Sequence, residues 1–190
     1  TNHTEFGAAD ITAGFIDRVF TITNSGTTNL YPGSISFIGA AASDFTVLTN
    51  PPASIATNDS APFAVRFNPS GVGTRSATIQ INSDDFDESP YQFAVSGSGF
   101  AILPLPQQQP VGRNVNALET VSFVFLVSGT PTITYQWFRN GVEIPGATSA
   151  TLTYIQVTGD EAGNYKCVAS NAAGSLASDE VALNVALLPT

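Results

Sequence analysis

Few residues in this chain could carry out chemistry. Its 190 residues include one cysteine, Cys167, and one histidine, His3. A thiolate could act as a nucleophile or a metal ligand, but His3 lies too close to the chain end to complete a Ser-His-Asp arrangement or a histidine-based zinc site. A lone thiol more often serves as a small buried side chain. We therefore expect no catalytic residue in this chain.

Four carboxylates stand close together in the first half, at Asp84, Asp85, Asp87 and Glu88. Carboxylate oxygens are ligands that Ca²⁺ accepts, although this spacing does not match an EF-hand loop. Calcium is the one cofactor that the sequence suggests, and the alternative is a plain solvated acidic loop. We expect Phe86, in the middle of the loop, to fold back against the domain.

The elements that would hold these residues are short strands. Turn residues recur at short intervals between runs rich in Val, Ile, Phe and Thr, without a sustained helical period. Within each run the apolar side chains alternate with polar ones and so share one strand face. In the first half the clearest runs are 20–22, 35–37, 63–67, 77–81 and 91–97, with weaker ones near Phe6 and Phe45. The pattern predicts an all-β chain.

The same alternation assigns side chains in the second half to the inside or the outside of a sandwich. Trp137, Tyr165 and Cys167 fall on inward positions, so Cys167 should lie beside Trp137. The expected strands are 121–127, 133–139 and 152–157, followed by two strands that contain Val168 and Leu183.

An outward face is also expected from these strands. Gln136 and Phe138 alternate with the inward residues of one strand, and Lys166 and Val168 with those of another. Neighbouring strands would place the four side chains together. They form a candidate binding face, with an ordinary surface as the alternative, because single exposed apolar residues are common.

Two segments of the second half, 137–153 and 162–175, follow the pattern of I-type immunoglobulin domains. The second half, residues 102–186, resembles this family, including its bacterial versions in large surface proteins. The resemblance implies a β-sandwich with a tyrosine corner, in which the Tyr165 hydroxyl bonds to nearby backbone. It implies no chemistry.

This second half departs from the family pattern at two positions. Phe125 stands where the first cysteine of the family is expected, so Cys167 has no disulfide partner. Glu161 stands where the family usually carries an aspartate that pairs with a basic residue. We expect that ion pair to be absent and the Phe125 ring to fill the space of the missing sulfur bridge.

The first half carries four further motifs, at 20–26, 42–47, 67–73 and 83–91. They resemble the choice-of-anchor D repeat of bacterial exported proteins, which is related to the ASPM-SPD-2-hydin domain. The resemblance covers nearly all of residues 4–99. It implies another immunoglobulin-like sandwich, in an exported protein built from repeated modules.

Length and charge agree with two globular domains. We expect domains at 1–101 and 111–190, joined by a connector at 102–110 whose prolines cannot donate ladder hydrogen bonds. The alternative is that part of the connector lies along the second domain as an irregular first strand. The chain holds 15 acidic and 6 basic residues, for a formal net charge of −9. Nucleic-acid phosphates would be repelled, and no apolar run is long enough to span a bilayer. We expect neither nucleic-acid binding nor membrane insertion within this segment.

Together these patterns predict an all-β chain of two tandem immunoglobulin-like β-sandwiches, with about seven to eight strands each. We expect a non-catalytic spacer or adhesive module of a larger exported, bacterial surface protein, located outside the cell or at its surface. Its partners would be other domains of the same protein and a glycan or a protein. The alternatives are a dedicated glycan- or protein-binding module, and accessory domains of an exported enzyme.

Overall fold

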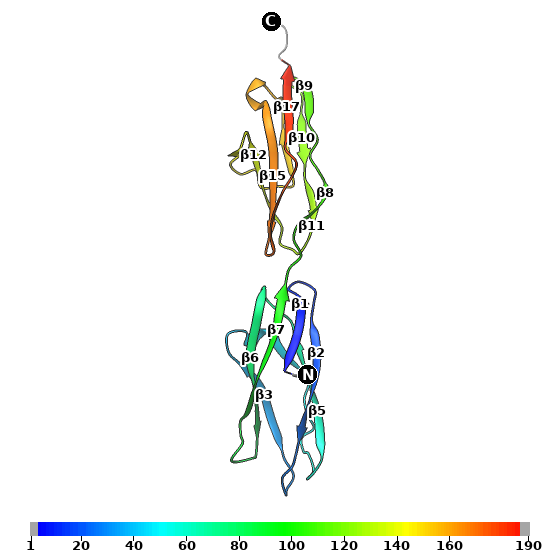
Figure 1. The fold of residues 1–190 in the computed structure, drawn as a ribbon, viewed down its shortest axis with the longest axis vertical. Helices are drawn as coiled ribbons and strands as arrows, with labels where there is room; N and C mark the ends of the chain where they lie inside the picture. The colour runs from blue at the N-terminus through cyan, green and yellow to red at the C-terminus, as the bar shows by residue number, and fades with distance from the viewer. Residues whose placement is uncertain (1–3, 187–190) are drawn as a thin grey trace. The chain divides into compact units, whose positions relative to one another are not determined.

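The computed structural model describes residues 4–186, so His3 lies outside the described residues. The chain divides into two compact units, Thr1–Phe100 and Ala101–Thr190. Both units are built from strands (Figure 1). No helix in the described part of the chain is long and apolar enough to cross a membrane.

The first unit is a sandwich of two sheets. Among its described residues, one sheet has the strand order β1-β7-β6-β3 and the other the order β2-β5-β4. Strands β1 and β7 run parallel, whereas the other neighbours run antiparallel. The strands are β1 (Glu5–Asp10), β2 (Ile16–Thr23), β3 (Pro32–Ile38), β4 (Phe45–Thr49), β5 (Ser60–Phe67), β6 (Gly73–Ser83) and β7 (Tyr91–Phe100), with a short 3-10 helix η1 (Ala42–Asp44) before β4.

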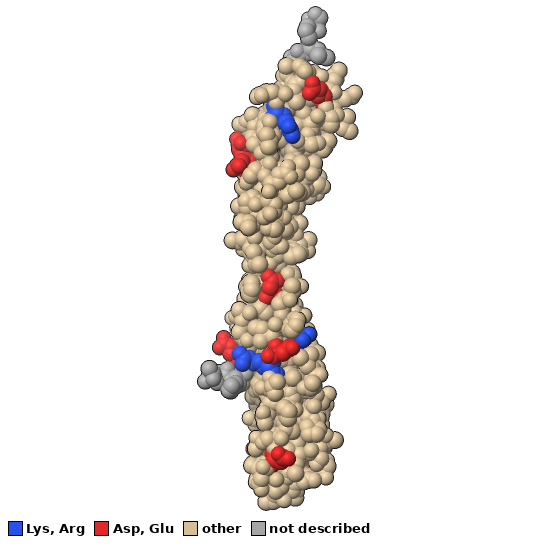
Figure 2. Space-filling model, turned by 90° about the vertical axis from the view of Figure 1, so that its right-hand side faces the viewer, with Lys and Arg blue, Asp and Glu red and all other residues tan. Residues whose placement is uncertain are grey.

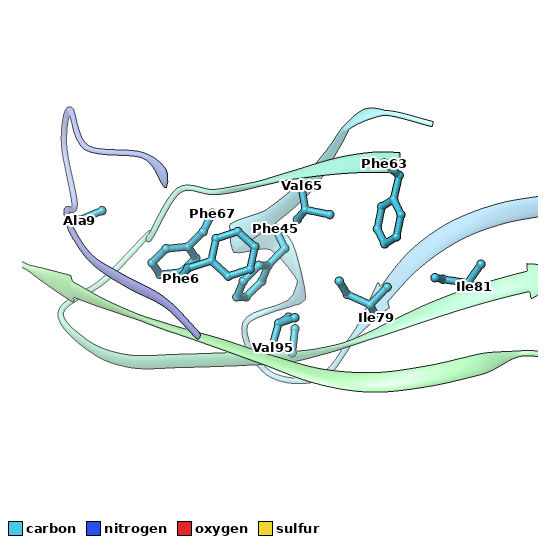
Figure 3. Packing of buried hydrophobic residues seen from close by; sticks show 10 residues of the cluster. Phe6, Ala9, Phe45, Phe63, Val65, Phe67, Ile79, Ile81 and Val95 are labelled. Carbon is cyan, nitrogen blue, oxygen red and sulfur yellow. The ribbon is translucent and has the colours of Figure 1, made fainter. Parts of the chain in front are cut away.

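Aromatic rings fill the space between these two sheets. Phe63 and Phe67 alternate with less buried residues on β5 and point inward. The ring centroid of Phe67 lies 5.0 Å from that of Phe45 and 5.8 Å from that of Phe6. Figure 3 shows Phe6, Phe45 and Phe67 gathered at one end of the cluster, with Phe63 and Ile81 at the other.

One glycine of β7 is required by this packing. Gly97 is buried against Phe67, and a Cβ at this position would overlap the Phe67 ring. Bulk on the inner face of β7 would therefore force the sheets apart, which explains the small residues near its C-terminal end.

The second unit is also a sandwich. Among its described residues, the larger sheet has the order β13-β12-β15-β17-β9, with β16 also paired to β15, and facing it are the pairs β10-β14 and β11-β8. The strands are β8 (Leu105–Gln108), β9 (Arg113–Asn116), β10 (Val121–Val124), β11 (Leu126–Ser128), β12 (Thr134–Arg139), β13 (Val142–Glu143), β14 (Thr151–Tyr154), β15 (Gly163–Asn171), β16 (Gly174–Ala177) and β17 (Val181–Ala186), with a 3-10 helix η2 (Gly159–Glu161) before β15.

One feature of the second unit differs from the sequence prediction. The strand expected at 121–127 is interrupted at Phe125, where the chain changes partner from β14 to β8. At the break the Phe125 N–H donates to the carbonyl oxygen of Ala150 at 2.9 Å. Within the expected connector at 102–110, β8 pairs with β11 and forms the irregular first strand of the second unit that the sequence left open.

Candidate functional site

The cysteine is sealed inside the second sandwich. Cys167 on β15 lies directly opposite Trp137 on β12, and both side chains are fully buried. The Trp137 indole N–H donates to the carbonyl oxygen of Ser149 at 2.9 Å, which fixes the ring. Burial raises the pKa of the Cys167 thiol to about 11. The thiol therefore stays protonated at neutral pH, where it is a poor nucleophile and metal ligand.

Phe125 is fully buried in the same apolar cluster as Cys167. Its ring meets that of Tyr135 edge-on, with centroids 6.5 Å apart. Burying a phenylalanine contributes about 2 kcal/mol, against typically about 2–4 kcal/mol for a disulfide. Since Cys167 is a free thiol, this sandwich is held by apolar packing without a cross-link.

Tyr165 has its hydroxyl bonded to the main chain. The hydroxyl donates to the carbonyl oxygen of Glu161 at 2.5 Å, and the ring stacks on Phe123 with centroids 4.8 Å apart. Burial raises the pKa of Tyr165 far above its ordinary value. This is the geometry of a tyrosine corner. A hydroxyl held in this way is not available as a nucleophile.

Glu161 has a structural role at the start of β15. Its carboxylate accepts hydrogen bonds from the N–H and the hydroxyl of Thr158, both at 2.7 Å, and these bonds lower the pKa of Glu161. The bond from the Thr158 N–H forms a capping box on η2 together with the Thr158 hydroxyl oxygen, which accepts from the Asp160 N–H at 3.3 Å. The Arg139 guanidinium donates to the carbonyl oxygen of Asp160 instead of forming a salt bridge there.

The structure brings the four residues of the candidate binding face together. Gln136 pairs with Val168 across β12 and β15, and Phe138 pairs with Lys166. All four are half-buried. The Gln136 amide already donates to the carbonyl oxygen of Ile144 at 2.8 Å. The face is therefore less accessible than alternation suggested, and its binding role stays a prediction.

The acidic loop joins β6 to β7. The Asp84 carboxylate accepts a hydrogen bond from the Tyr31 N–H at 2.8 Å. A hydrogen bond with the neighbouring Asp87 carboxyl raises the pKa of Asp85. Within residues 4–186, no three His, Cys, Asp or Glu side chains gather as a metal site requires. A calcium site at these residues and Glu88 stays a prediction without support from the geometry.

The position of Phe86 in this loop differs from the expectation. Its side chain is 101% exposed and does not fold back on the sandwich. The N–H of Ser89 donates to the carbonyl oxygen of Asp85 at 3.1 Å and closes a tight turn. The turn leaves the Phe86 ring in solvent, and alternation along a strand cannot anticipate this.

A buried ion pair in the first sandwich was not indicated by the sequence. Asp44 at the end of η1 is 1% exposed, and Arg75 Nε on β6 lies 2.6 Å from its Oδ2. Burial opposes ionisation of Asp44, but the hydrogen bond from Arg75 helps to hold its pKa below the usual value. A lone acid in a run of small residues carries no sequence signal for this role.

The sequence also did not indicate a cleft of about 520 Å³ in the first sandwich. Its lining includes Phe20, Phe63 and Phe93, together with Asp85 and Glu88 of the acidic loop. Alternation places the three rings on inward faces. The space between them depends on where the neighbouring strands end, which no local pattern encodes.

Residues 106–185 match the family model described as the immunoglobulin domain. Tyrosine-protein kinase-like otk of Drosophila willistoni is 34% identical over 43% of this chain and 8% of its own length. HEPACAM family member 2 of Mus musculus is 29% identical over 64% of this chain and 25% of its own length. Cartilage intermediate layer protein 2 of Homo sapiens is 29% identical over 81% of this chain and 14% of its own length. The chain thus spans a small part of these relatives.

Solved structures with similar folds include a titin M4 domain and the tandem immunoglobulin repeats of Dlar. The titin domain is 25% identical, covers 46% of this chain and 99% of its own, and has a TM-score of 0.42. The Dlar repeats are 19% identical, cover 97% of this chain and 94% of their own, and have a TM-score of 0.44.

The predicted fold class is confirmed, because the chain is all-β with an immunoglobulin-like sandwich fold. The family match lies in the second sandwich. These findings do not support the choice-of-anchor D resemblance of the first sandwich or a bacterial source, since the matched relatives are animal proteins.

Proposed function

We propose that this chain is a non-catalytic adhesive module, which also spaces neighbouring domains, in a larger protein outside the cell or at its surface. The observation that carries this proposal is that the folded chain buries its one thiol and hydrogen-bonds the hydroxyl of its buried tyrosine to the backbone. Cys167 is buried beside Trp137, and the Tyr165 hydroxyl is bonded to backbone. Any binding to a partner would therefore involve the surface and the loops of the chain.

The character of the surface supports a binding role. Charged residues make up 11% of the chain, and they are sparse on the face shown in Figure 2. A surface with few charges loses little hydration on contact with a partner. The match to a protein named for cartilage, over 81% of this chain, supports a place outside the cell.

The partner proposed is a protein, ahead of a glycan, because immunoglobulin domains commonly mediate protein interactions. The motifs that resemble choice-of-anchor D repeats, and the bacterial host they imply, stay proposals about the first sandwich. The adhesive role does not depend on the host.

The test uses beads coated with the complete chain and allowed to settle on cultured animal cells. One batch of cells is treated with protease and another with glycosidases. Attachment that protease removes and glycosidases leave intact is the expected result. Attachment lost only with glycosidases would replace the protein partner with a glycan. Absence of attachment to any cells would contradict the adhesive role and leave a spacer.

A further inference from the structure

The cleft of the first sandwich has an aromatic floor. Phe20 on β2 stacks on Phe63 with ring centroids 5.3 Å apart, and it lies 5.5 Å from Phe93 on β7. Ile81 also lines the cleft. Figure 3 shows Phe63 and Ile81 at one end of the apolar cluster, and both residues line the cleft. Its volume of about 520 Å³ suffices for several side chains of a ligand.

Among the described residues, β1 pairs with only the later part of β7. The pairing of β1 with β7 begins at Glu5 and Ser96 and runs toward Phe100. The preceding part of β7 holds Tyr91 and Phe93, which line the cleft. Tyr91 is 55% exposed, so an apolar wall faces the opening.

The opposite wall is an edge of β2 that pairs with no other strand among residues 4–186. Among the described residues β2 is the outermost strand of its sheet, with β5 as its neighbour. Thr21 stands opposite Pro62, which has no N–H. The backbone hydrogen bonds between β2 and β5 therefore form at the residues on either side of Thr21. The backbone N–H and C=O groups of Thr21 and Thr23 therefore point away from β5. Both residues line the cleft.

The loop that follows β2 is held rigidly at the end of the cleft. Asn24 is 6% exposed, and its amide nitrogen donates to the carbonyl oxygens of Thr28 and Ile55, both at 2.9 Å. Its side-chain oxygen accepts from the Gly26 N–H at 3.0 Å. A cleft end fixed in this way needs little ordering when a ligand enters.

The charges at the cleft have one sign. Asp85 and Glu88 contribute to the lining, and no Lys or Arg is among the described residues that do. The Asp87 carboxyl beside Asp85 adds to the negative charge of this loop. A positively charged group on a ligand would relieve the repulsion between these carboxylates.

We propose that this cleft binds an extended peptide from a partner protein, with apolar side chains at alternate positions and a lysine or arginine near one end. The peptide backbone pairs with Thr21 and Thr23 and adds a strand beside β2. Alternate side chains rest on Phe20 and Phe93, since successive residues of a strand face opposite sides. The basic residue meets the acidic loop at Glu88. This inference rests on the adhesive function and names the partner's chemistry.

The experiment selects a displayed library of random nonapeptides on the complete chain. The expected result is enrichment of peptides with apolar residues at alternate positions and a basic residue. The enriched peptides are then synthesised and their affinities are measured by calorimetry. Thermal unfolding verifies that each variant is folded before its affinity is compared.

Two variants with matched controls locate the binding site. Glu88→Lys should weaken binding by about tenfold or more, whereas Glu143→Lys, the same charge change in the second sandwich, should not. Thr21→Pro removes an outward N–H of β2 and should weaken binding by about tenfold. Val19→Pro removes the next outward N–H along the same strand, outside the cleft lining, and should leave affinity unchanged.

Three results would overturn this site: no enrichment, enrichment of acidic peptides, or affinities that Glu88→Lys and Thr21→Pro do not change. The bead assay separates this failure from failure of the proposed function. Intact attachment to cells without peptide binding removes the site and keeps the adhesive role. Peptide binding without attachment to cells keeps the site and removes that role.

Discussion

Cys167 combines the features that make a thiol inert. It is fully buried opposite Trp137, and burial raises its pKa to about 11. Because the thiolate is the reactive form, we predict that the folded chain resists maleimide at about pH 8 and reacts completely once unfolded in guanidinium. Mass spectrometry of timed samples measures the labelling. Rapid labelling of the folded chain would show that the site is open.

Phe125 should account for a large share of the stability of the second sandwich. Phe125→Ala leaves a cavity in a closed core, so we predict a loss of about 3–5 kcal/mol in its free energy of unfolding. Trp137, the single tryptophan of the chain, reports this transition by fluorescence in a denaturant titration. Ile155→Ala is the matched control, since Ile155 is 78% exposed and should change stability by less than about 0.5 kcal/mol. A loss of similar size in both variants would contradict the buried role.

Among the elements of the first sandwich, η1 is tied to β6 by the pair of Asp44 and Arg75. Arg75→Ala would leave a buried carboxylate unpaired, and we predict a loss of about 3 kcal/mol in the free energy of unfolding at neutral pH. Arg66→Ala breaks the exposed pair with Asp17 and should cost no more than about 1 kcal/mol. Denaturant titrations followed by circular dichroism compare the two variants. Equal losses in the free energy of unfolding would show that the burial of Asp44 does not add to the cost of breaking its ion pair.

The same pair predicts a dependence on pH. The pKa of Asp44 is lowered in the folded chain, so the pair contributes stability above the unfolded-state pKa of about 3.9 and loses it as pH falls through the folded value. The stability difference between wild type and Arg75→Ala should therefore shrink below about pH 4. Denaturant titrations of both proteins at several acidic pH values measure this stability difference. A difference that stays constant into acid would exclude ionised Asp44 as its cause.

The acidic loop after β6 gives a prediction about metal. Asp84 is engaged by the Tyr31 N–H, and within residues 4–186 no three candidate ligands gather. We predict that millimolar calcium leaves the melting temperature of the first sandwich unchanged, as followed by calorimetry. A rise in melting temperature that Asp87→Asn abolishes would establish the calcium site after all.

Strand faces could be predicted from the sequence, but strand partners could not. Alternation placed Trp137, Tyr165 and Cys167 inside because side-chain direction is a local property of a strand. The break at Phe125 arises from a change of pairing partner, which depends on residues far away in the chain. The exposure of Phe86 follows from the turn that closes at Ser89. Position in a turn overrides the preference of an apolar ring for the interior.

The candidate sites likewise combine features that the sequence indicated with features that it did not. The sequence marked Asp85 and Glu88 by their density of charge, but it suggested calcium and gave no hint of a cleft. Among the described residues, three conditions meet at the cleft: the start of β1 at Glu5, which leaves the first part of β7 without a partner on that side, the outermost place of β2 in its sheet, and the acidic loop. Each condition is a matter of topology, so local periodicity could not reveal their combination.

Each of the two sandwiches has its own buried apolar cluster. A formal net charge of −9 opposes association of the chain with copies of itself. Sandwiches with closed cores and acidic character are suited to presenting surfaces without aggregating. Binding should therefore depend on the surface and be indifferent to the groups that the cores enclose.

The most direct test of this account compares bead attachment by the wild type with that by the double variant Cys167→Ala, Tyr165→Phe. The double variant removes the thiol and the phenol hydroxyl that the core of the second sandwich encloses, and the assay is run at a temperature at which the variant is folded. We expect equal, protease-sensitive attachment for both. Loss of attachment by the folded double variant would mean that the buried chemistry carries the function, and would contradict the account.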